Sequence, residues 1–356
     1  MSYKFRSICL KASSVALFLL IMQAAFAQKA VKEYGVEKYK ALDAAIKEKQ
    51  SVIGKDLVVL LWTDTLQYKT ELGDFNSKTV APIASCSKWL TAALVLQAVD
   101  EGKIALDDKV AYYLPIFESY GKSYITVRHC LSHMTGIESD KNFLQRKKFN
   151  SLEEEVESFA KKEIKANAGV EFRYSNIGLN IAARVLEVVY KKKFDMLIKQ
   201  KLFTPLGMRQ TTFSTLDMSA PNPSGGAKST ADEYMNFLVM LLNKGMYKDK
   251  RILSEASVAE MRKLQTSPST IKFAPRSAEG FQYALGSWVI EGPLQTSPNG
   301  GDLATALASP GLFGTWPMID WKKGYAVIFF VKNFLGEQKA DAYMELKKVV
   351  DASVNK

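Results

Sequence analysis

Strand-like sequence lies at the two ends of this chain of 356 residues, and that arrangement restricts the fold more than any other feature. Residues 52–63, with the apolar run Leu57–Trp62, predict a buried strand, and residues 65–72 predict a second one. Four more strands are predicted near the other end, at residues 283–291, 303–309, 312–319 and 325–331. The sequence between has mainly helical periodicity. We therefore expect an α/β (α+β) fold in which an antiparallel sheet, flanked by helices, is built from both chain ends around an inserted all-helical lobe.

This arrangement predicts a discontinuous domain. Residues 28–88 and 226–356 are expected to form the sheet-and-helix domain, and residues 89–225 the helical lobe. The Pro- and Gly-rich stretch 221–226 is the expected return from the lobe.

The first 27 residues have the pattern of a secretory signal peptide. Lys4, Arg6 and Lys11 precede an apolar run at residues 12–26, and small residues precede Gln28. The run is too short for a transmembrane anchor. We expect cleavage after Ala27, which leaves 329 residues of an exported protein, periplasmic or extracellular, with no stable membrane anchor.

The net charge of +11 falls to +8 once the three basic residues of the signal peptide are removed. Because this excess is spread along mixed-charge helices, it predicts no nucleic-acid partner. Cys86 and Cys130 both lie in apolar helical contexts, and a chain of this size needs no disulfide for stability. We expect two buried free thiols.

Ser85 begins a strongly predicted helix that ends at Gly102, and Lys88 lies three residues further on. Residues three apart share a helix face, so the hydroxyl and the amine can meet. A lysine screened from water loses basicity and can accept the serine proton, and a helix N-terminus favours developing negative charge. The alternative is an N-cap serine before an ordinary lysine, and Cys86 is a weaker candidate nucleophile because the amine is aligned with Ser85.

Two further segments carry polar or glycine residues that suit a catalytic site. Tyr174 and Asn176 lie in a loop that enters a helix predicted at residues 177–191, where the alternative is a core tyrosine and a capping asparagine. Ser309 and Gly311, with Leu312 after them, lie near the start of a late strand.

Together with residues 101–108 and 125–136, these segments resemble the serine β-lactamase and penicillin-binding-protein superfamily. The resemblance is strongest to its β-lactamase-related branch, which holds class C β-lactamases, D-amino-acid peptidases and the family VIII esterases, and it covers about residues 35–335. It implies a β-lactamase/transpeptidase-like fold.

The resemblance also implies a role for each matching residue. Ser85 corresponds to the acylated nucleophile, Lys88 to its proton partner, and Tyr174 to a general base or proton relay. Asn176 corresponds to the asparagine that orients the substrate. Chemistry supports these roles, because a nearby cation helps a tyrosine to lose its proton and a side-chain amide both donates and accepts hydrogen bonds.

The chain departs from the family at Ser309, where β-lactamases and D,D-peptidases of the superfamily carry a lysine or histidine that helps to bind a substrate carboxylate. Family VIII esterases also replace this cation, with an aromatic residue. Gly311 is expected to let a substrate approach the strand, and the Leu312 amide to pair with that of Ser85 as an oxyanion hole. The departure favours neutral esters or amides over carboxylate-bearing β-lactams.

The two histidines, His129 and His133, lie four residues apart, a spacing that can hold zinc. With no third histidine and no H-E-x-x-H motif, we expect no metal site, no Ser-His-Asp triad and no cofactor. Lys228 precedes a helix and lacks the glycine of the missing cationic motif, so we interpret it as a surface residue.

We therefore predict an exported serine hydrolase that cleaves a small-molecule carboxylic ester through an acyl-enzyme on Ser85. Two alternatives stay open. One is a D-peptidase or weak β-lactamase that acts on cell-wall-related amides, and the other is a non-catalytic binding protein or sensor with the same fold.

Overall fold

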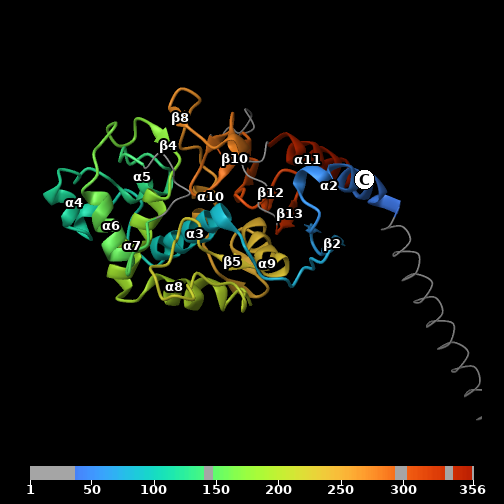
Figure 1. The fold of residues 1–356 in the computed structure, drawn as a ribbon, viewed down its shortest axis with the longest axis horizontal. Coiled ribbons are helices and arrows are strands. Elements are labelled where there is room, and N and C mark those ends of the chain that lie inside the picture. Colours follow the sequence, from blue (N-terminus) through green and yellow to red (C-terminus); the bar gives the residue numbers. More distant parts are fainter. Residues whose placement is uncertain (1–36, 140–146, 293–302, 333–339, 355–356) are drawn as a thin grey trace, which may run out of the picture. The chain divides into compact units, whose positions relative to one another are not determined.

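The structure is a computed structural model that describes residues 37–139, 147–292, 303–332 and 340–354 (Figure 1). The predicted signal peptide lies outside the described residues. The chain divides into two compact units, one of Met1–Glu48 with Leu346–Lys356 and one of Lys49–Glu345. All the predicted site residues belong to the second unit.

This larger unit contains a seven-stranded antiparallel sheet in the order β2-β1-β13-β12-β11-β10-β9. Its strands are β1 (Leu57–Trp62), β2 (Leu66–Leu72), β9 (Gln282–Tyr283), β10 (Trp288–Glu291), β11 (Ala306–Ala308), β12 (Trp316–Asp320) and β13 (Tyr325–Val331). β1 pairs along its whole length with β13, with Leu60 opposite Ile328. The antiparallel sheet built from both chain ends is thus confirmed.

Both faces of β13 are covered. Ala326, Ile328 and Phe330 belong to the main hydrophobic core, while Phe329 packs edge-on against Tyr343. The helix α9 (Ala231–Leu242) contacts β1, β12 and β13. Complete burial explains why the sequence of β13 is a continuous apolar run with no polar alternation.

Helices and short helical turns lie between the strands of this sheet and at both ends of the described chain. They are α2 (Lys40–Ile53), α3 (Ser87–Asp100), α4 (Ile116–Ser119), α5 (Val127–Leu131), α6 (Leu152–Ala160), α7 (Ile177–Tyr190), α8 (Phe194–Ile198), α10 (Glu255–Glu260) and α11 (Ala340–Val354), with short turns η1 (Ala84–Cys86), η2 (Val110–Tyr112), η3 (Lys199–Phe203) and η4 (Arg276–Ala278). Three two-stranded sheets pair β3 (Ala81–Pro82) with β5 (Lys228–Ser229), β4 (Phe172–Arg173) with β8 (Ile271–Phe273), and β6 (Met246–Tyr247) with β7 (Lys250–Arg251).

The helix α3 lies inside the larger unit, between α7 and α10, both of which it contacts (Figure 1). Every residue from 87 to 98 is buried. A helix that is buried on all sides needs apolar residues all round, which the sequence of α3 supplies. Its first turn is therefore held rigidly by the core.

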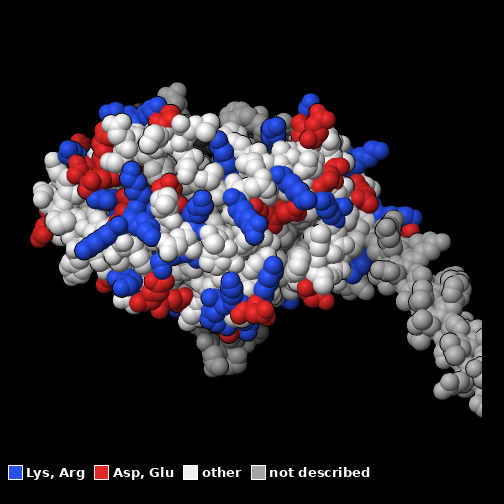
Figure 2. Space-filling model, turned by 90° about the horizontal axis from the view of Figure 1, so that it is seen from below, with Lys and Arg blue, Asp and Glu red and all other residues white. Residues whose placement is uncertain are grey.

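Cys86 and Cys130 are buried free thiols, as the sequence predicts. On the face shown in Figure 2, acidic and basic side chains are interspersed with uncharged surface. Within the described ranges, no helix is long and apolar enough to cross a membrane.

Candidate active site

Ser85 lies in the 3-10 turn η1, which leads directly into α3. Ala84 has a left-handed backbone with φ of 44°, a conformation that a non-glycine residue adopts only when its surroundings impose it. The Ser87 hydroxyl, at the start of α3, accepts a hydrogen bond of 3.0 Å from the Ala227 N–H. The residue that follows the turn is thus held by a hydrogen bond to the Ala227 segment, while Ser85 itself remains partly exposed.

Lys88 points back from the first turn of α3 toward Ser85. Its side chain is only 1% exposed, and Nζ lies 3.4 Å from Ser85 Oγ. Nζ also lies 3.0 Å from Asn176 Oδ1 and 2.8 Å from the carbonyl oxygen of Ser224. Burial lowers the pKa of Lys88 to about 7.

These partners give the amine a defined orientation. A neutral lysine amine has two N–H donors and one lone pair, and Asn176 and Ser224 each offer an acceptor oxygen. With both donors used, the lone pair is left for the Ser85 hydroxyl. The geometry therefore suits an amine that removes the serine proton.

Tyr174 lies beside Lys88. Its ring centre lies 4.7 Å from Lys88 Nζ, and its side chain is buried. Burial raises the pKa of Tyr174 above its ordinary value, and the hydrogen bond with Ser85 offsets this only in part. The loss of solvation on burial outweighs the Ser85 hydrogen bond, so the phenol holds its proton more tightly than a free tyrosine does. A protonated phenol is suited to relay a proton.

Asn176 occupies the N-cap position of α7, but its side chain makes no capping hydrogen bond. Its Oδ1 instead accepts the hydrogen bond from Lys88. The alternative of a simple helix cap is thus excluded by the geometry, and Asn176 lies with Lys88 at the site.

Ser309 and Gly311 pack against the segment that carries Ser85. The Ser309 hydroxyl is buried and donates to the Ser85 carbonyl at 3.4 Å. A Cβ on Gly311 would lie 2.4 Å from the Ile83 carbonyl oxygen and 3.0 Å from Cys86 Sγ. The structure therefore gives a packing reason for glycine at this position, because the loop lies directly against the segment that carries Ser85. The expected approach of a substrate stays a prediction.

The Ser85 and Leu312 amides are the predicted oxyanion donors. Neither N–H has an acceptor among the described residues. Both residues are partly exposed. N–H groups without a protein acceptor, on the partly exposed residues Ser85 and Leu312, are compatible with binding an oxyanion.

Cys86, the alternative nucleophile, points away from solvent. Its Sγ lies 3.6 Å from the Thr315 carbonyl oxygen, and burial raises the pKa of the thiol. A buried, protonated thiol is a poor nucleophile.

The sequence did not point to the Ser224 carbonyl, which holds Lys88. The stretch 221–226 was interpreted only as a return from the lobe. In the structure, Asn180 Oδ1 accepts a hydrogen bond of 3.0 Å from the Ser224 N–H, and Asn180 Nδ2 donates to the buried Glu155 at 3.1 Å. A main-chain acceptor leaves no signature in side-chain chemistry, so no local pattern reveals it.

The two histidines bind side chains and backbone of the protein. His129 Nδ1 accepts the Thr126 N–H at 3.2 Å, and His133 Nε2 lies 3.1 Å from the Tyr283 hydroxyl. In the part of the chain that the structure describes, no group of three or more His, Cys, Asp or Glu residues is arranged to hold a metal ion.

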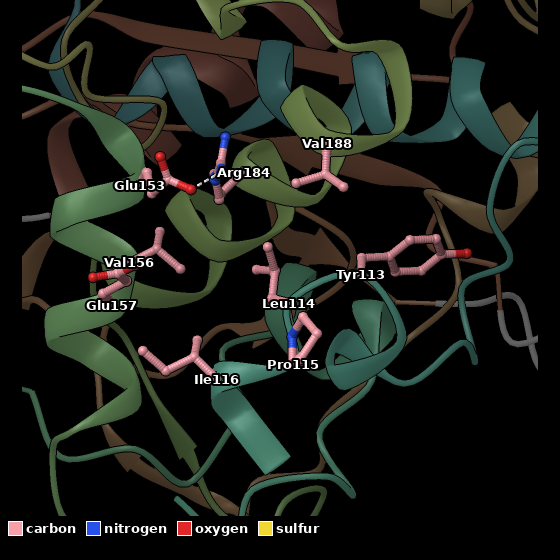
Figure 3. Close-up of a pocket in the computed structure, with 9 residues that line it drawn as sticks. All are labelled: Tyr113, Leu114, Pro115, Ile116, Glu153, Val156, Glu157, Arg184 and Val188. Atoms are coloured by element: carbon pink, nitrogen blue, oxygen red, sulfur yellow. Dashed lines mark hydrogen bonds and ion pairs between the residues drawn. The ribbon is translucent and has the colours of Figure 1, made fainter. Parts of the chain in front are cut away.

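A separate cavity of about 260 Å³ lies between α4, α6 and α7 (Figure 3). Its floor is mainly apolar, and Arg184 at its edge points to Glu153, with which it forms an ion pair. None of the predicted site residues lines this cavity.

Known proteins resemble this chain over most of its length. The family model described as Beta-lactamase matches residues 53–350. "Penicillin-binding protein 4" from Amycolatopsis lactamdurans is 27% identical over 298 residues, which cover 74% of this chain and 78% of the relative.

Solved structures share the fold. A Bacteroides dorei DSM 17855 protein, provisionally named a β-lactamase, has a TM-score of 0.78 and 25% identity over 89% of this chain and 99% of its own. EstCE1, described as a hydrolase with promiscuous acyltransferase activity, has a TM-score of 0.74 and 18% identity over the same shares, 89% and 99%. The chain therefore belongs to the β-lactamase family, within the superfamily of serine β-lactamases and penicillin-binding proteins.

Proposed function

We propose that the protein is a serine hydrolase that cleaves small, neutral carboxylic esters through an acyl-enzyme on Ser85. The observation that carries this proposal is the environment of Lys88, whose amine is buried, has a pKa of about 7 and lies 3.4 Å from Ser85 Oγ. An ordinary surface lysine would be protonated at neutral pH and could not act as a base.

The reaction has two halves. In the first, Ser85 Oγ attacks the ester carbonyl carbon while its proton passes to Lys88, and the Ser85 and Leu312 amides stabilise the oxyanion. The C–O bond then breaks, and the alcohol leaves with a proton relayed through Tyr174. In the second half, water attacks the acyl carbon and releases the acid, and Ser85 regains its proton.

The preference for neutral esters rests on Ser309. Its short hydroxyl donates to the Ser85 carbonyl and carries no charge to pair with a substrate carboxylate. EstCE1, described as a hydrolase with promiscuous acyltransferase activity, shares the fold. Activity on p-nitrophenyl butyrate, together with weak turnover of nitrocefin, is the expected result. Efficient opening of nitrocefin without esterase activity would contradict the ester preference.

The relative named as a penicillin-binding protein supports a second candidate, a D-peptidase or weak β-lactamase. A non-catalytic sensor is the third. Intact-mass measurement after incubation with a fluorophosphonate separates catalysis from simple binding: we expect one adduct on the wild type and none on Ser85→Ala. Equal labelling of both proteins would contradict Ser85 as the nucleophile. Because a sensor can also acylate, steady-state turnover must accompany the labelling.

We also propose that the protein is exported and cleaved after Ala27. The basic residues and apolar run of the first 27 residues support this. N-terminal sequencing of the protein from a bacterial periplasm or culture medium should begin at Gln28. Recovery of the full-length chain only from the cytoplasm would contradict it.

A further inference from the structure

We propose that His133 is a positioning residue for Tyr174, which it holds through the N–H groups of the two residues that flank that tyrosine and through ring contact. The inference rests on the proposed function, in which Tyr174 relays protons. It assigns a specific task to a histidine that belongs neither to a metal site nor to a triad.

The contacts of His133 surround Tyr174. The Arg173 N–H donates to the His133 carbonyl oxygen at 3.1 Å, and the Ser175 N–H points to His133 Nδ1 at 3.4 Å. The centroids of the His133 and Tyr174 rings are 4.6 Å apart. One residue therefore restrains the backbone before Tyr174, the backbone after it and one side of its ring.

The imidazole is itself held in one state. Because Nδ1 accepts from Ser175, the ring proton lies on Nε2 and is donated to the Tyr283 hydroxyl, 3.1 Å away. Phe172 packs edge-on against the ring at 5.6 Å, and His133 is only 3% exposed. Burial and the nearby Lys88 hold the pKa of His133 well below its ordinary value, so the neutral ring persists.

The backbone of His133 adds an independent observation. Its φ is 57°, in the left-handed region, which is uncommon for residues other than glycine although asparagine, aspartate and histidine adopt it more often than the rest. Such a conformation persists where the surroundings impose it. Here the left-handed residue is the one whose carbonyl and ring both bind the Tyr174 segment.

The other histidine offers a matched control. His129 also accepts a backbone N–H through Nδ1, from Thr126, but it makes none of these contacts with the Tyr174 segment. We compare His133→Leu, His133→Asn and His129→Leu. Asparagine tolerates the left-handed region and offers an oxygen to the Ser175 N–H, whereas leucine does neither.

We expect His133→Leu to lower both kcat for p-nitrophenyl butyrate and the rate of fluorophosphonate labelling by at least about tenfold, because misplaced catalytic groups cost rate rather than binding. KM should stay within about twofold. His133→Asn should recover most of the lost rate, and His129→Leu should keep wild-type rates even if it is less stable. Unchanged rates in His133→Leu, no recovery in His133→Asn, or an equal loss in His129→Leu would overturn the proposal.

A double-mutant cycle tests whether His133 acts through Tyr174. In a Tyr174→Phe background, His133→Leu should cost little further rate, because the group it positions is gone. Additive losses would contradict positioning.

If His133→Leu fails to fold, Tyr283→Phe removes the partner of Nε2 and keeps the ring, and it should lower the labelling rate about threefold. An unchanged rate in Tyr283→Phe would then overturn the proposal.

A measurement without turnover separates this inference from the proposed function. The ¹³Cζ resonance of Tyr174, assigned by its loss in Tyr174→Phe, should shift or broaden in His133→Leu and stay unchanged in His129→Leu. Absence of Ser85 labelling in the wild type would contradict the proposed hydrolase, while this resonance would still decide the role of His133. If the Tyr174 resonance does not change in His133→Leu, the proposed positioning role of His133 is overturned.

Discussion

Lys88 meets two requirements that usually conflict at the scale of a single residue. Its burial makes the charged form costly, yet its donors are not left without partners, because Asn176 and Ser224 accept from Nζ. The neutral amine is thus favoured without an unsatisfied polar group. In the neutral amine the remaining lone pair can accept the Ser85 proton, because Oγ lies 3.4 Å from Nζ.

The pH dependence of acylation follows from this. Only the unprotonated amine can accept the Ser85 proton, and the unprotonated fraction rises with pH through the Lys88 pKa of about 7. We therefore expect kcat/KM for p-nitrophenyl butyrate to fall about tenfold per unit below pH ~6 and to level off above pH ~8. Steady-state rates across this range test the prediction. The residual activity of Lys88→Met should not show this fall at low pH. A flat wild-type profile would argue against Lys88 as the base.

Gly311 gives a second prediction for a single residue. Gly311→Ala places a Cβ 2.4 Å from the Ile83 carbonyl oxygen, so η1 must shift. We expect a loss of about 2 kcal/mol or more in the free energy of unfolding, measured in urea, with reduced labelling of Ser85. Gly292→Ala is the control, because its Cβ would meet nothing within 4 Å. Equal stability of the two variants would show that the loop does not pack tightly on η1.

At the scale of elements, α7 supports the lysine from a distance. Asn180 of this helix accepts the Ser224 N–H, Thr91 of α3 donates to the Pro223 carbonyl oxygen at 2.7 Å, and the carbonyl of Ser224 accepts from Lys88. Two helices thus clamp a segment without regular secondary structure. This clamp fixes the acceptor that orients the amine.

Asn180→Leu tests the clamp. It leaves the Ser224 N–H without this acceptor and removes the donor that faces Glu155, in a fully buried position. We expect a loss of about 1–3 kcal/mol in the free energy of unfolding and a lower kcat, because buried hydrogen bonds to Ser224 and Glu155 are lost, while Asn222 Oδ1 still accepts the Ser224 N–H at 3.2 Å. Ser224→Ala, which keeps the carbonyl, should change kcat much less. The idea fails if the two variants lose the same fraction of kcat.

The elements themselves differ in how well sequence predicts them. The predicted strand 325–331 and the predicted helix 177–191 agree with β13 and α7, because each has a long, uninterrupted apolar pattern. The strands predicted at 303–309 and 312–319 are shorter in the structure. A bond of 2.8 Å from the Gly311 N–H to the Thr315 carbonyl oxygen closes a turn between them. That bond depends on backbone geometry, which the hydrophobic periodicity of the sequence does not reveal.

At the scale of the whole molecule, one hydrophobic core joins the two predicted parts. It includes Leu60 and Ile328 of the sheet together with Leu131 and Leu186 of the helical stretch. Burial of α3 on all sides links them. A continuous core implies that neither part is stable without the other.

We therefore expect a single unfolding transition for residues 49–345. In Trp89→Phe, the four remaining tryptophans all lie in the predicted sheet-and-helix domain, so their fluorescence reports on that part. Its urea midpoint should coincide with that of far-UV circular dichroism, which is dominated by helices. Two separated midpoints would show that the predicted domains unfold independently.

The sheet from both chain ends, the helix after Ser85 and the short list of polar residues around it could be predicted from the sequence, because periodicity and motif spacing are local properties. The surroundings of these residues became visible only in the folded structure. It set the Ser224 carbonyl against Lys88, protonated Tyr174 by burial, and required glycine at 311 because of the close approach of η1. These features depend on distances and desolvation between segments far apart in the chain, which no local pattern encodes.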